Sequence, residues 1–583
     1  MIKRLLIANR GEIARRIIRA CRELEIETVA VYSDADAGSP HVSEADRAIR
    51  IGPPPARDSY LNIDAIIEAA RTSKADAIHP GYGFLSERAP FVRAVETAGL
   101  IFVGPPAAAL EKMGSKVGAR QLMTAAKVPV VPGETPSDQS DAALISAATK
   151  IGFPVLIKPA AGGGGIGMKA VDDASGLAAA LAAARREAKS SFGNDTLYVE
   201  RLIERPRHVE IQVFADNHGH TVHVFERECS LQRRHQKVIE ESPCAALSAA
   251  VRERMGAAAV AAAKAVGYRN AGTCEFLLEG DGDEARFYFL EMNTRLQVEH
   301  PVTECVVGVD LVHAQLRVAS GEPLPFTQES QSQRGHAIEC RIYAEDPAQG
   351  FLPQAGTILH YREPQGPGIR VDSGVREGSE VSVFYDPMLA KLIVFAETRD
   401  AARRRAITAL RDFSIGGIGT NLGLLTQILE HPQFVRASVD TGFLDREVQS
   451  LVASIPQENL APQQNAAIGT LGTSGTLGTA DPFVALKGWR LDGRSSWTGP
   501  TTTARTATRR AGHDSGVMSP MPATVVAIIA AVGEQVSEGQ TVIVLEAMKM
   551  ELPIKAPRSG VVKAVHCAKG DLVQPGVILL ELD

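Results

Sequence analysis

The sequence has few cysteines, few aromatic residues and no long apolar run. Its seven cysteines are scattered and form no CxxC pair, which argues against a disulfide framework or zinc site and predicts a reducing cytoplasm. No stretch approaches the roughly 18 apolar residues of a membrane helix. No signal peptide is expected, because MIKRLLIANRGE passes from a short basic start into a strand and helix pattern. With 62 basic and 68 acidic residues, the net charge of −6 argues against a nucleic-acid partner.

The length of 583 residues exceeds what one hydrophobic core supports, so several domains are expected. Strand-like apolar runs alternate with helical patterns, which predicts an α/β fold with a doubly wound, mostly parallel sheet. The expected strands cover residues 2–8, 27–32, 75–79, 154–158, 209–214, 221–225, 274–278 and 286–291, and the expected helices cover 12–21, 142–148 and 248–266.

The composition changes after about residue 450. Residues 468–482 are rich in glycine and threonine and lack periodicity, which is typical of a flexible linker. A short island at 483–497 contains both tryptophans of the chain, and a second polar linker follows at 498–512. The arginines and threonines of that second linker are interpreted as a solvated tether rather than a recognition element.

The last segment repeats itself with an offset of 37 residues, because Gly533, Val536 and Gly539 recur as Gly570, Val573 and Gly576. Apolar pairs follow the same offset, as Ile528 does with Val565 and Ile543 with Leu580. Two related halves of short strands predict a small pseudo-twofold β-sandwich.

Lys549 stands in the sequence Glu-Ala-Met-Lys-Met (546–550), at the turn between the two halves. A carrier domain needs one nucleophilic amine on an exposed turn, where acylation removes its charge. The alternative is an ordinary surface lysine between two core methionines. The Pro-Met-Pro at 520–522 and the flanking repeats favour a modified lysine.

A glycine-rich loop at 158–167 follows an expected strand, as a loop that covers phosphates does. Glycine has no Cβ, so its backbone N–H groups can approach phosphate oxygens closely. The loop is not a Walker A motif, and an ordinary glycine-rich turn remains the alternative. Lys116 and Lys158 could add positive charge near a nucleotide, although isolated lysines are usually only solvated.

Polar residues alternate along residues 291–299, which read EMNTRLQVE, shortly after Glu275. On an extended strand the odd-numbered positions would share one face, presenting two carboxylates, two amides and an arginine. Carboxylate and amide oxygens suit Mg²⁺, and the arginine, the glutamine and the second carboxylate could hold and deprotonate a small oxyanion. A salt-bridged surface strand is the alternative.

Several motifs in order resemble the biotin carboxylase component of biotin-dependent carboxylases, which are ATP-grasp enzymes. They are LLIANRGEIARRI, HPGYGFLSE, RPRHVEIQV, CSLQRRHQKVIEE, EMNTRLQVEHPVTE, GHAIECRIYAEDP and YDPMLAKLIV. The tail with its AMKM sequence is similar to a biotinyl carrier domain, so Lys549 is expected to carry covalent biotin. The resemblance implies an α/β and α+β multidomain chain. Its expected parts are a Rossmann-like domain at 1–114, an ATP-grasp domain at 115–330 with a mobile lid at about 133–203, a C-terminal domain at 331–447, a linker at 448–515 and an all-β biotinyl sandwich at 516–583.

The resemblance also implies roles for individual residues, carried over motif by motif. ATP would contact Lys116, Lys158, Gly163, Gly164, Gly165, Glu200, His208 and His235, and two Mg²⁺ or Mn²⁺ ions would bind Glu275 and Glu291, with Asn293 alongside. Bicarbonate would bind Lys237, Arg295, Gln297 and the Val298 backbone, and Glu299 would take the proton of bicarbonate. Arg341 would stabilise the biotin enolate. Bicarbonate would attack the γ-phosphate of ATP to give carboxyphosphate, whose breakdown releases CO₂ and phosphate. The phosphate would then remove the biotin N1′ proton, and the enolate would attack CO₂.

The chain departs from the family pattern in the glycine loop, where Ile166 replaces the usual basic residue and Ala161 one glycine. A lost cation would weaken ATP binding or lid closure.

The carboxylase region ends like that of acyl-CoA carboxylase α subunits, but the segment before the carrier is too short for their docking domain. The Trp489/Trp497 island is either a reduced docking element or a degenerate linker.

The expected partners are a carboxyltransferase β subunit, a biotin protein ligase and a second copy of the carboxylase region; no nucleic acid or membrane is expected. Three functions compete. The first is biotin carboxylation for an acyl-CoA acceptor. The second is the same half-reaction serving pyruvate, 2-oxoglutarate or urea. The third is a biotin carrier scaffold with an impaired ATP site.

Overall fold

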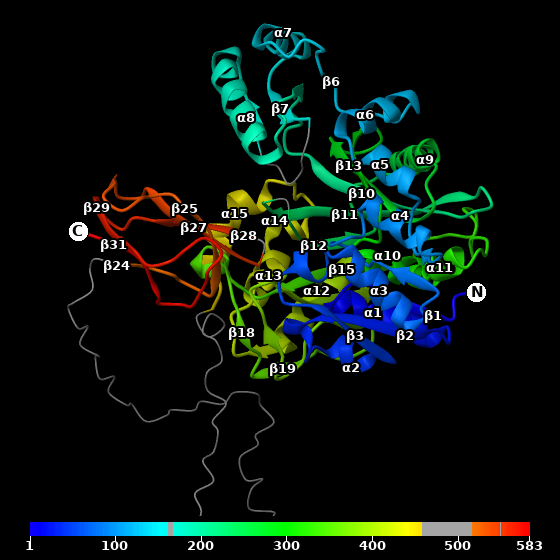
Figure 1. Cartoon of the computed structure of the whole chain (residues 1–583). Coiled ribbons are helices and arrows are strands. Elements are labelled where there is room, and N and C mark those ends of the chain that lie inside the picture. The colour runs from blue at the N-terminus through cyan, green and yellow to red at the C-terminus, as the bar shows by residue number, and fades with distance from the viewer. Residues whose placement is uncertain (161–166, 235, 457–515, 549) are drawn as a thin grey trace, which may run out of the picture. The chain divides into compact units, whose positions relative to one another are not determined.

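The computed structural model describes residues 1–160, 167–234, 236–456, 516–548 and 550–583. The described chain divides into a large N-terminal unit and a small C-terminal unit (Figure 1), and each is described by itself. Among the described residues, no helix is long and apolar enough to cross a membrane.

The large unit begins with a five-stranded parallel sheet in the order β3-β2-β1-β4-β5. Alternate residues of β1 enter two different cores: Leu5 and Ile7 pack with α1, whereas Leu6 packs with α3 and α4. Helices therefore cover both faces of this sheet, which confirms the doubly wound α/β prediction. Its elements are β1 (Arg4–Ile7), α1 (Gly11–Glu23), β2 (Glu27–Ser33), α2 (Pro40–Glu44), β3 (Arg47–Gly52), α3 (Ile63–Ser73), β4 (Ala77–His79), α4 (Ala89–Thr97), β5 (Ile101–Phe102), α5 (Ala107–Met113) and α6 (Lys116–Ala125).

An eight-stranded, antiparallel sheet follows, in the order β14-β13-β10-β11-β12-β15-β22-β20. Helix α9 packs with β10 and β13 at one end, and α12, α13 and α15 pack with β15 and β22 at the other. The elements are β10 (Arg207–Ala215), β11 (Thr221–Arg233), β12 (Gln236–Ser242), α9 (Ala249–Val266), β13 (Asn270–Glu279), β14 (Arg286–Asn293), α10 (His300–Val307), α11 (Leu311–Ala319), β15 (His336–Tyr343), β20 (Ile369–Ser373), β22 (Met388–Ala396), α12 (Arg399–Asp412), α13 (Leu422–Glu430), α14 (Pro432–Val435) and α15 (Phe443–Ala453). Short ladders join β16 (Glu345–Asp346) to β17 (Leu352–Pro353), β18 (Gly356–Thr357) to β21 (Glu380–Val381) and β19 (His360–Arg362) to β23 (Ser414–Gly416).

A separate four-stranded sheet in the order β6-β9-β7-β8 lies at the top of Figure 1 with α7 and α8. Its apolar residues form a core of their own, which includes Leu144, Val155, Ile157 and Leu181. A body with its own core inside residues 133–203 is what a lid requires, whereas its motion stays a prediction. The elements are β6 (Gly133–Glu134), α7 (Asp141–Ile151), β7 (Val155–Pro159), β8 (Lys169–Val171), α8 (Leu177–Phe192) and β9 (Leu197–Arg201).

The small unit has two four-stranded sheets, in the orders β24-β31-β29-β26 and β28-β27-β25-β30. Its strands are β24 (Gly516–Met518), β25 (Ala523–Ile528), β26 (Gln535–Val536), β27 (Thr541–Ala547), β28 (Met550–Lys555), β29 (Gly560–Val565), β30 (Leu572–Val573) and β31 (Ile578–Leu582). The 37-residue offset carries β25 onto β29, β26 onto β30 and β27 onto β31, so each sheet order maps onto the other. The predicted pseudo-twofold sandwich is therefore confirmed.

Gly533 and Gly570 occupy equivalent turns with φ of 87° and 96°, which strain an L-residue. Replacing either by alanine should destabilise the small unit by a similar amount, about 1–2 kcal/mol. Calorimetry of the full chain should show the midpoint of that unit falling by about 4–8 °C per kcal/mol. Ser537→Ala, at an exposed turn position, should leave the midpoint unchanged. A drop for only one of the two glycines would contradict their structural equivalence.

Candidate functional site

The polar row at 291–299 does not lie on one extended strand, which corrects the sequence prediction. Strand β14 ends at Asn293, and residues 294–299 form bends and turns. The reason is a long-range contact: the Thr294 N–H and hydroxyl donate to Glu87 Oε1 at 2.9 and 3.1 Å, which takes the backbone out of the ladder. The side chains nevertheless converge on Glu275, which β13 supplies directly opposite Glu291.

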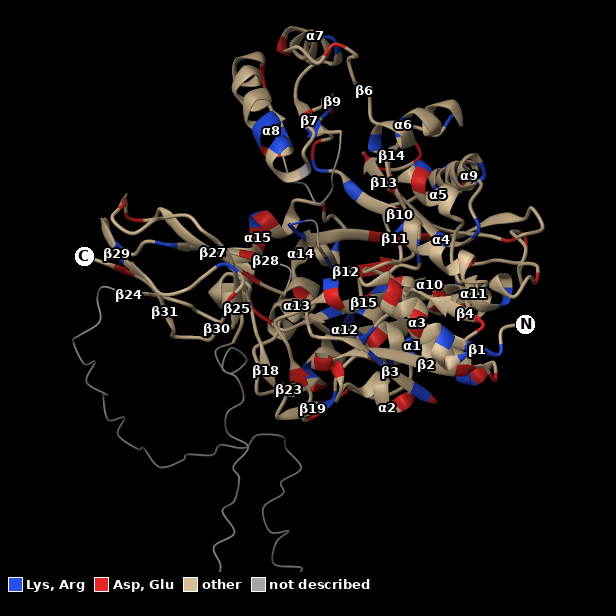
Figure 2. Ribbon diagram, viewed as in Figure 1, with Lys and Arg blue, Asp and Glu red and all other residues tan. Residues whose placement is uncertain are grey.

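Lys237 of β12 is the centre of the site. Its Nζ lies 2.5 Å from Glu210 Oε2, 2.9 Å from Glu275 Oε1 and 2.7 Å from Glu299 Oε1. The lysine side chain is only 11% exposed, and the three carboxylates are buried. The three glutamates come from β10, β13 and the turn before α10, so one ammonium joins three elements that are distant in sequence. Figure 2 shows acidic and basic segments side by side on the strands of this sheet.

Burial alone would raise the pKa of the Glu299 carboxyl, but Lys237 and Arg341 outweigh it and hold that pKa well below its usual range. The same balance lowers the pKa of Glu275, through Lys237 and His208. Although burial disfavours the ammonium form, the three carboxylates raise the pKa of Lys237 well above its usual value. Glu299 is therefore an ionised carboxylate at neutral pH, as a general base must be.

Arg341 of β15 contacts Glu299 from the other side. Its Nη2 lies 2.9 Å from Glu299 Oε2, and its Nε donates to Glu240 Oε1 at 2.6 Å. Burial raises the pKa of Glu240 to about 7, against the opposing charge of Arg341. Both oxygens of Glu299 are thus occupied by different cations, which fixes the carboxylate in one orientation.

Arg295 holds the amides of the row in place. Its guanidinium donates to Gln297 Oε1 at 3.0 Å and Asn293 Oδ1 at 3.1 Å, and Glu87 accepts from its Nε at 3.1 Å. The amide nitrogens of Asn293 and Gln297 in turn donate to Glu275 Oε1, at 2.7 and 3.2 Å. The structure thus brings together Lys237, Glu275, Asn293, Arg295, Gln297, Glu299 and Arg341.

Among the predicted ATP contacts, Lys158 of β7 pairs with Glu200 of β9 at 2.5 Å, and both are buried. Lys116 begins α6, and burial together with the charge of Lys158 lowers its pKa. His208 of β10 reaches the carboxylate site, since its Nε2 lies 3.2 Å from Glu275 Oε2. The other predicted positions, Gly163 to Gly165, Ile166, His235 and Lys549, lie outside the described residues.

The predicted metal ligands fit a hard divalent cation by their donor chemistry. Glu291 is an exposed residue that lies opposite Glu275 in the β13–β14 ladder, and the burial of its carboxyl group together with the charge of Glu275 raises its pKa. Carboxylate and amide oxygens in this pairing suit Mg²⁺ or Mn²⁺, which share their remaining positions with phosphate oxygens and water. His208, Glu210 and Glu275 also bring three ligand atoms within 4.8 Å of one another.

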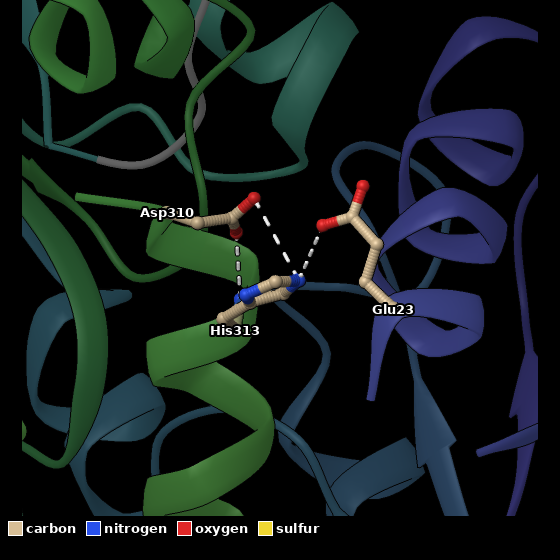
Figure 3. Close-up of side chains that lie close together, drawn as sticks. All are labelled: Glu23, Asp310 and His313. Atoms are coloured by element: carbon tan, nitrogen blue, oxygen red, sulfur yellow. Dashed lines mark hydrogen bonds and ion pairs between the residues drawn. The ribbon is translucent and has the colours of Figure 1, made fainter. Parts of the chain in front are cut away.

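A second group of ligand-type side chains, Glu23, Asp310 and His313, lies between α1 and α11 (Figure 3). Asp310 caps α11 by accepting from the His313 N–H at 2.8 Å, and its Oδ2 is held by Arg16 at 2.6 Å. Because a cation would have to displace that guanidinium, the group is explained by capping and ion pairing.

Sequence reasoning missed Glu87, Glu210 and Glu240, and also the buried Arg227, whose Nε donates to Glu210 Oε1 at 2.5 Å. The sequence could have revealed Glu210, because His208, Glu210 and Gln212 alternate on one face of an otherwise apolar strand. That pattern marks a polar face inside the protein. Glu87 and Glu240 had no such signal, because their partners lie far away in sequence.

The eight-stranded sheet with its carboxylates, and the separate four-stranded sheet that carries Lys158, define the ATP-grasp class of ligases. Four family models match the chain: "Biotin carboxylase, N-terminal domain" at residues 1–110, "Carbamoyl-phosphate synthase L chain, ATP binding domain" at 115–327, "Biotin carboxylase C-terminal domain" at 339–446 and "Biotin-requiring enzyme" at 515–582. A biotin carboxylase of Campylobacter jejuni, solved as a complex with an ATP analogue, is 45% identical, with a TM-score of 0.73 over 76% of this chain and 99% of that one.

Among curated relatives, the biotin carboxylase of Halalkalibacterium halodurans is 51% identical over 449 residues, 77% of this chain and 98% of that protein. The mitochondrial methylcrotonoyl-CoA carboxylase subunit alpha of rice is 50% identical over 81% of this chain, and the match spans 64% of the rice protein. Its mouse counterpart is 40% identical over 100% of this chain and 93% of that protein. The chain belongs to the biotin carboxylase family and adds a biotinyl domain, as acyl-CoA carboxylase α subunits do.

The pH dependence of the stability of a Lys237→Met variant should test the ion pairs of Lys237 with Glu210, Glu275 and Glu299. In the wild type, Lys237 lowers the folded pKa of Glu275 and Glu299, so their contribution to stability is present above the usual carboxyl pKa and lost as the pH falls. Without the ammonium, burial would raise these pKa values, and the variant should lose stability as the pH rises. Urea unfolding followed by circular dichroism should show a deficit of about 3–5 kcal/mol near pH 8 that shrinks toward about pH 5.

Lys264→Met, which removes an exposed lysine of α9, is the matched control and should show a small difference at both pH values. A deficit of equal size at both pH values for Lys237→Met would contradict the assignment of Lys237 as the counter-charge of the carboxylates.

Proposed function

We propose that this chain carboxylates biotin held on its own Lys549, using ATP and bicarbonate, and that a separate carboxyltransferase subunit passes the carboxyl group to an acyl-CoA. The observation that carries the proposal is the carboxylate of Glu299, ionised and fixed between Lys237 and Arg341. Family membership in the biotin carboxylases and the matched biotinyl domain support it.

The proposed site divides its work between cations and one base. Lys237, Arg295, Gln297 and the Val298 N–H bind bicarbonate. Glu299 takes its proton as the bicarbonate oxygen attacks the γ-phosphate of ATP and ADP leaves. Carboxyphosphate then breaks down to CO₂ and phosphate, the phosphate takes the N1′ proton of biotin, and the enolate attacks CO₂. Arg341 stabilises the enolate oxygen. Two anions must meet and a weakly acidic urea must ionise, so prepositioned positive charge is the main requirement.

ATP would lie between the two sheets of the ATP-grasp region, in contact with Lys116, Lys158, Glu200, His208 and His235 and covered by Gly163 to Gly165. Glu275, Glu291 and Asn293 would hold the two divalent ions, which supply positive charge to the phosphates. The lid at about 133–203 would close over the nucleotide. Its separate core supports movement as one body.

The partners follow from the same proposal. A biotin protein ligase would modify Lys549, which lies in the sequence between β27 and β28, and the carboxylase region would pair with a second copy. A related structure, the biotin carboxylase domain of 2-oxoglutarate carboxylase from Hydrogenobacter thermophilus, is described as a dimer and is 43% identical. All seven cysteines are free thiols, which supports a reducing cytoplasm.

The acceptor is proposed to be an acyl-CoA because relatives aligned along the whole chain are named methylcrotonoyl-CoA and propionyl-CoA carboxylases. Solved structures from a 2-oxoglutarate carboxylase and a pyruvate carboxylase each cover 77% of this chain. 2-Oxoglutarate and pyruvate are therefore the alternative acceptors. A carrier scaffold with an impaired ATP site is the third function, and Ile166 is its only support.

ADP release by the purified chain with Mg²⁺-ATP and bicarbonate, with and without free biotin, tests the proposal. Turnover should rise with biotin, and Glu299→Gln should lower the stimulated rate by at least about 100-fold, because proton transfer by a positioned base contributes about 10²–10⁴. No turnover by a chain that is biotinylated at Lys549 would favour the scaffold. In that case Ile166→Arg should restore activity by returning a cation to the glycine loop.

The Trp489/Trp497 island, which lies outside the described residues, is proposed to dock the β subunit. The 673 aligned positions of the mouse relative against 583 residues here leave at least 90 without a counterpart, which supports a shortened docking region. Trp489→Ala should reduce co-purification with the β subunit while ADP release stays at the wild-type rate, and Arg505→Ala in the second linker is the control. Unchanged co-purification would leave a degenerate linker as the explanation.

A further inference from the structure

The turn before α10 carries Val298 and Glu299, and no sheet ladder supports it, because β14 ends at Asn293. The Val298 N–H makes no hydrogen bond to any described residue, as a donor reserved for a ligand should. A loop that must present one N–H and one carboxylate needs its peptide planes held by other groups.

His300, the first residue of α10, holds the first of these planes. Its Nδ1 lies 2.8 Å from the Gln297 carbonyl oxygen, and since a carbonyl only accepts, Nδ1 carries the proton. The Gln297 carbonyl and the Val298 N–H belong to the same peptide group. Because a trans peptide group is planar, fixing the carbonyl also fixes the direction of the N–H. His300 thereby sets the direction of the Val298 N–H.

The ring of His300 is fully buried, and its Nε2 has no hydrogen-bond partner among the described residues. Burial, opposed only partly by Glu304, lowers the pKa of His300 well below its usual value. The imidazole is neutral across the working pH range, so it acts as a fixed donor and takes no part in proton transfer.

Lys391 of β22 holds the second plane. Its Nζ donates to the Val298 carbonyl oxygen at 2.7 Å, and it pairs with Glu12 of α1 at 3.3 Å. The lysine is 0% exposed. The peptide that contains this carbonyl leads directly into Glu299, so the ammonium fixes the backbone from which the base projects. Tyr82 donates its hydroxyl to Glu12 and completes the chain of contacts.

We propose that His300 and Lys391 are positioning residues for bicarbonate, which fix the peptide planes on either side of Val298 and thereby aim the Val298 N–H and the Glu299 carboxylate. Neither residue touches the reacting atoms. The inference rests on the proposed function, because it assumes that bicarbonate binds at this turn.

The test compares variants that keep or remove each contact at similar volume. His300→Asn retains a donor at the place of Nδ1, whereas His300→Leu removes it. Lys391→Met together with Glu12→Gln removes both members of the buried Lys391–Glu12 pair, so Glu12 is not left as a carboxylate without its cation. Arg317→Gln with Glu322→Gln removes an exposed ion pair of similar type and serves as the control.

His300→Leu and the Lys391→Met/Glu12→Gln double variant should raise the KM for bicarbonate by about 10–100-fold, since small misplacement of a reacting group costs up to about 10²-fold. The KM for ATP should stay within about twofold, and His300→Asn should keep the KM for bicarbonate within about threefold of the wild type. A purely structural role would lower the unfolding midpoint without separating the two KM values.

The outcomes distinguish the two claims. A wild-type chain without bicarbonate-dependent ADP release would overturn the proposed function. An active wild type, with folded variants that share its KM for bicarbonate, would overturn the positioning role alone. Because the histidine and lysine variants are independent, misfolding of one set leaves the other to decide.

Discussion

The site depends on one buried ammonium. Lys237 lies within 2.5 to 2.9 Å of three carboxylates from three separate elements. Removing it would leave three buried negative charges that repel one another in a medium of low dielectric, where each would bind a proton instead. Its presence keeps Glu275 and Glu299 ionised, and these carboxylates have opposite tasks: one is expected to hold a cation, and the other to accept a proton. A single positive charge thus prepares both functions.

The same charge also explains how an acidic site can receive an anion. Five carboxylates face four cations, so carboxylates are in excess: Glu87, Glu210, Glu240, Glu275 and Glu299 against Arg227, Lys237, Arg295 and Arg341. Arg227 donates to Glu210, Gln212 and Thr303, and Arg341 donates to Glu240 and Glu299, so protein oxygens orient both guanidinium groups. Bicarbonate bound next to Lys237 and Arg295 would share charges that are already desolvated, which removes much of the reorganisation that water would impose. Divalent ions at Glu275 and Glu291 would offset the remaining negative charge.

Packing makes this arrangement a property of the whole large unit. Glu12 lies in the region matched by the N-terminal family model, Val298 and His300 in the ATP-binding region, and Lys391 in the C-terminal region. One hydrophobic core likewise combines Leu5 and Ile13 with Phe214 and Leu311. The turn that bears Glu299 therefore takes its form only when all three regions are docked.

Sequence patterns predicted the strands, helices and repeat, because these follow local periodicity. They failed at residues 294–299, where Glu87 decides the backbone from about 200 positions away.

The symmetry of the small unit bears on how biotin reaches this site. The offset that relates β27 to β31 and β28 to β24 makes the connection between β27 and β28 the counterpart of the place where the chain enters and leaves the sandwich. Within this unit the C-terminal end and the β27–β28 hairpin lie at opposite ends of the strands (Figure 1). The chain thus enters the sandwich far from the connection between β27 and β28, and the length of a seven-residue strand, roughly 20 Å, would add to the reach of a biotin attached there. Because β27 is an ordered strand, this distance is gained without further loss of chain entropy, and the residues that precede β24 would have only to span the remainder.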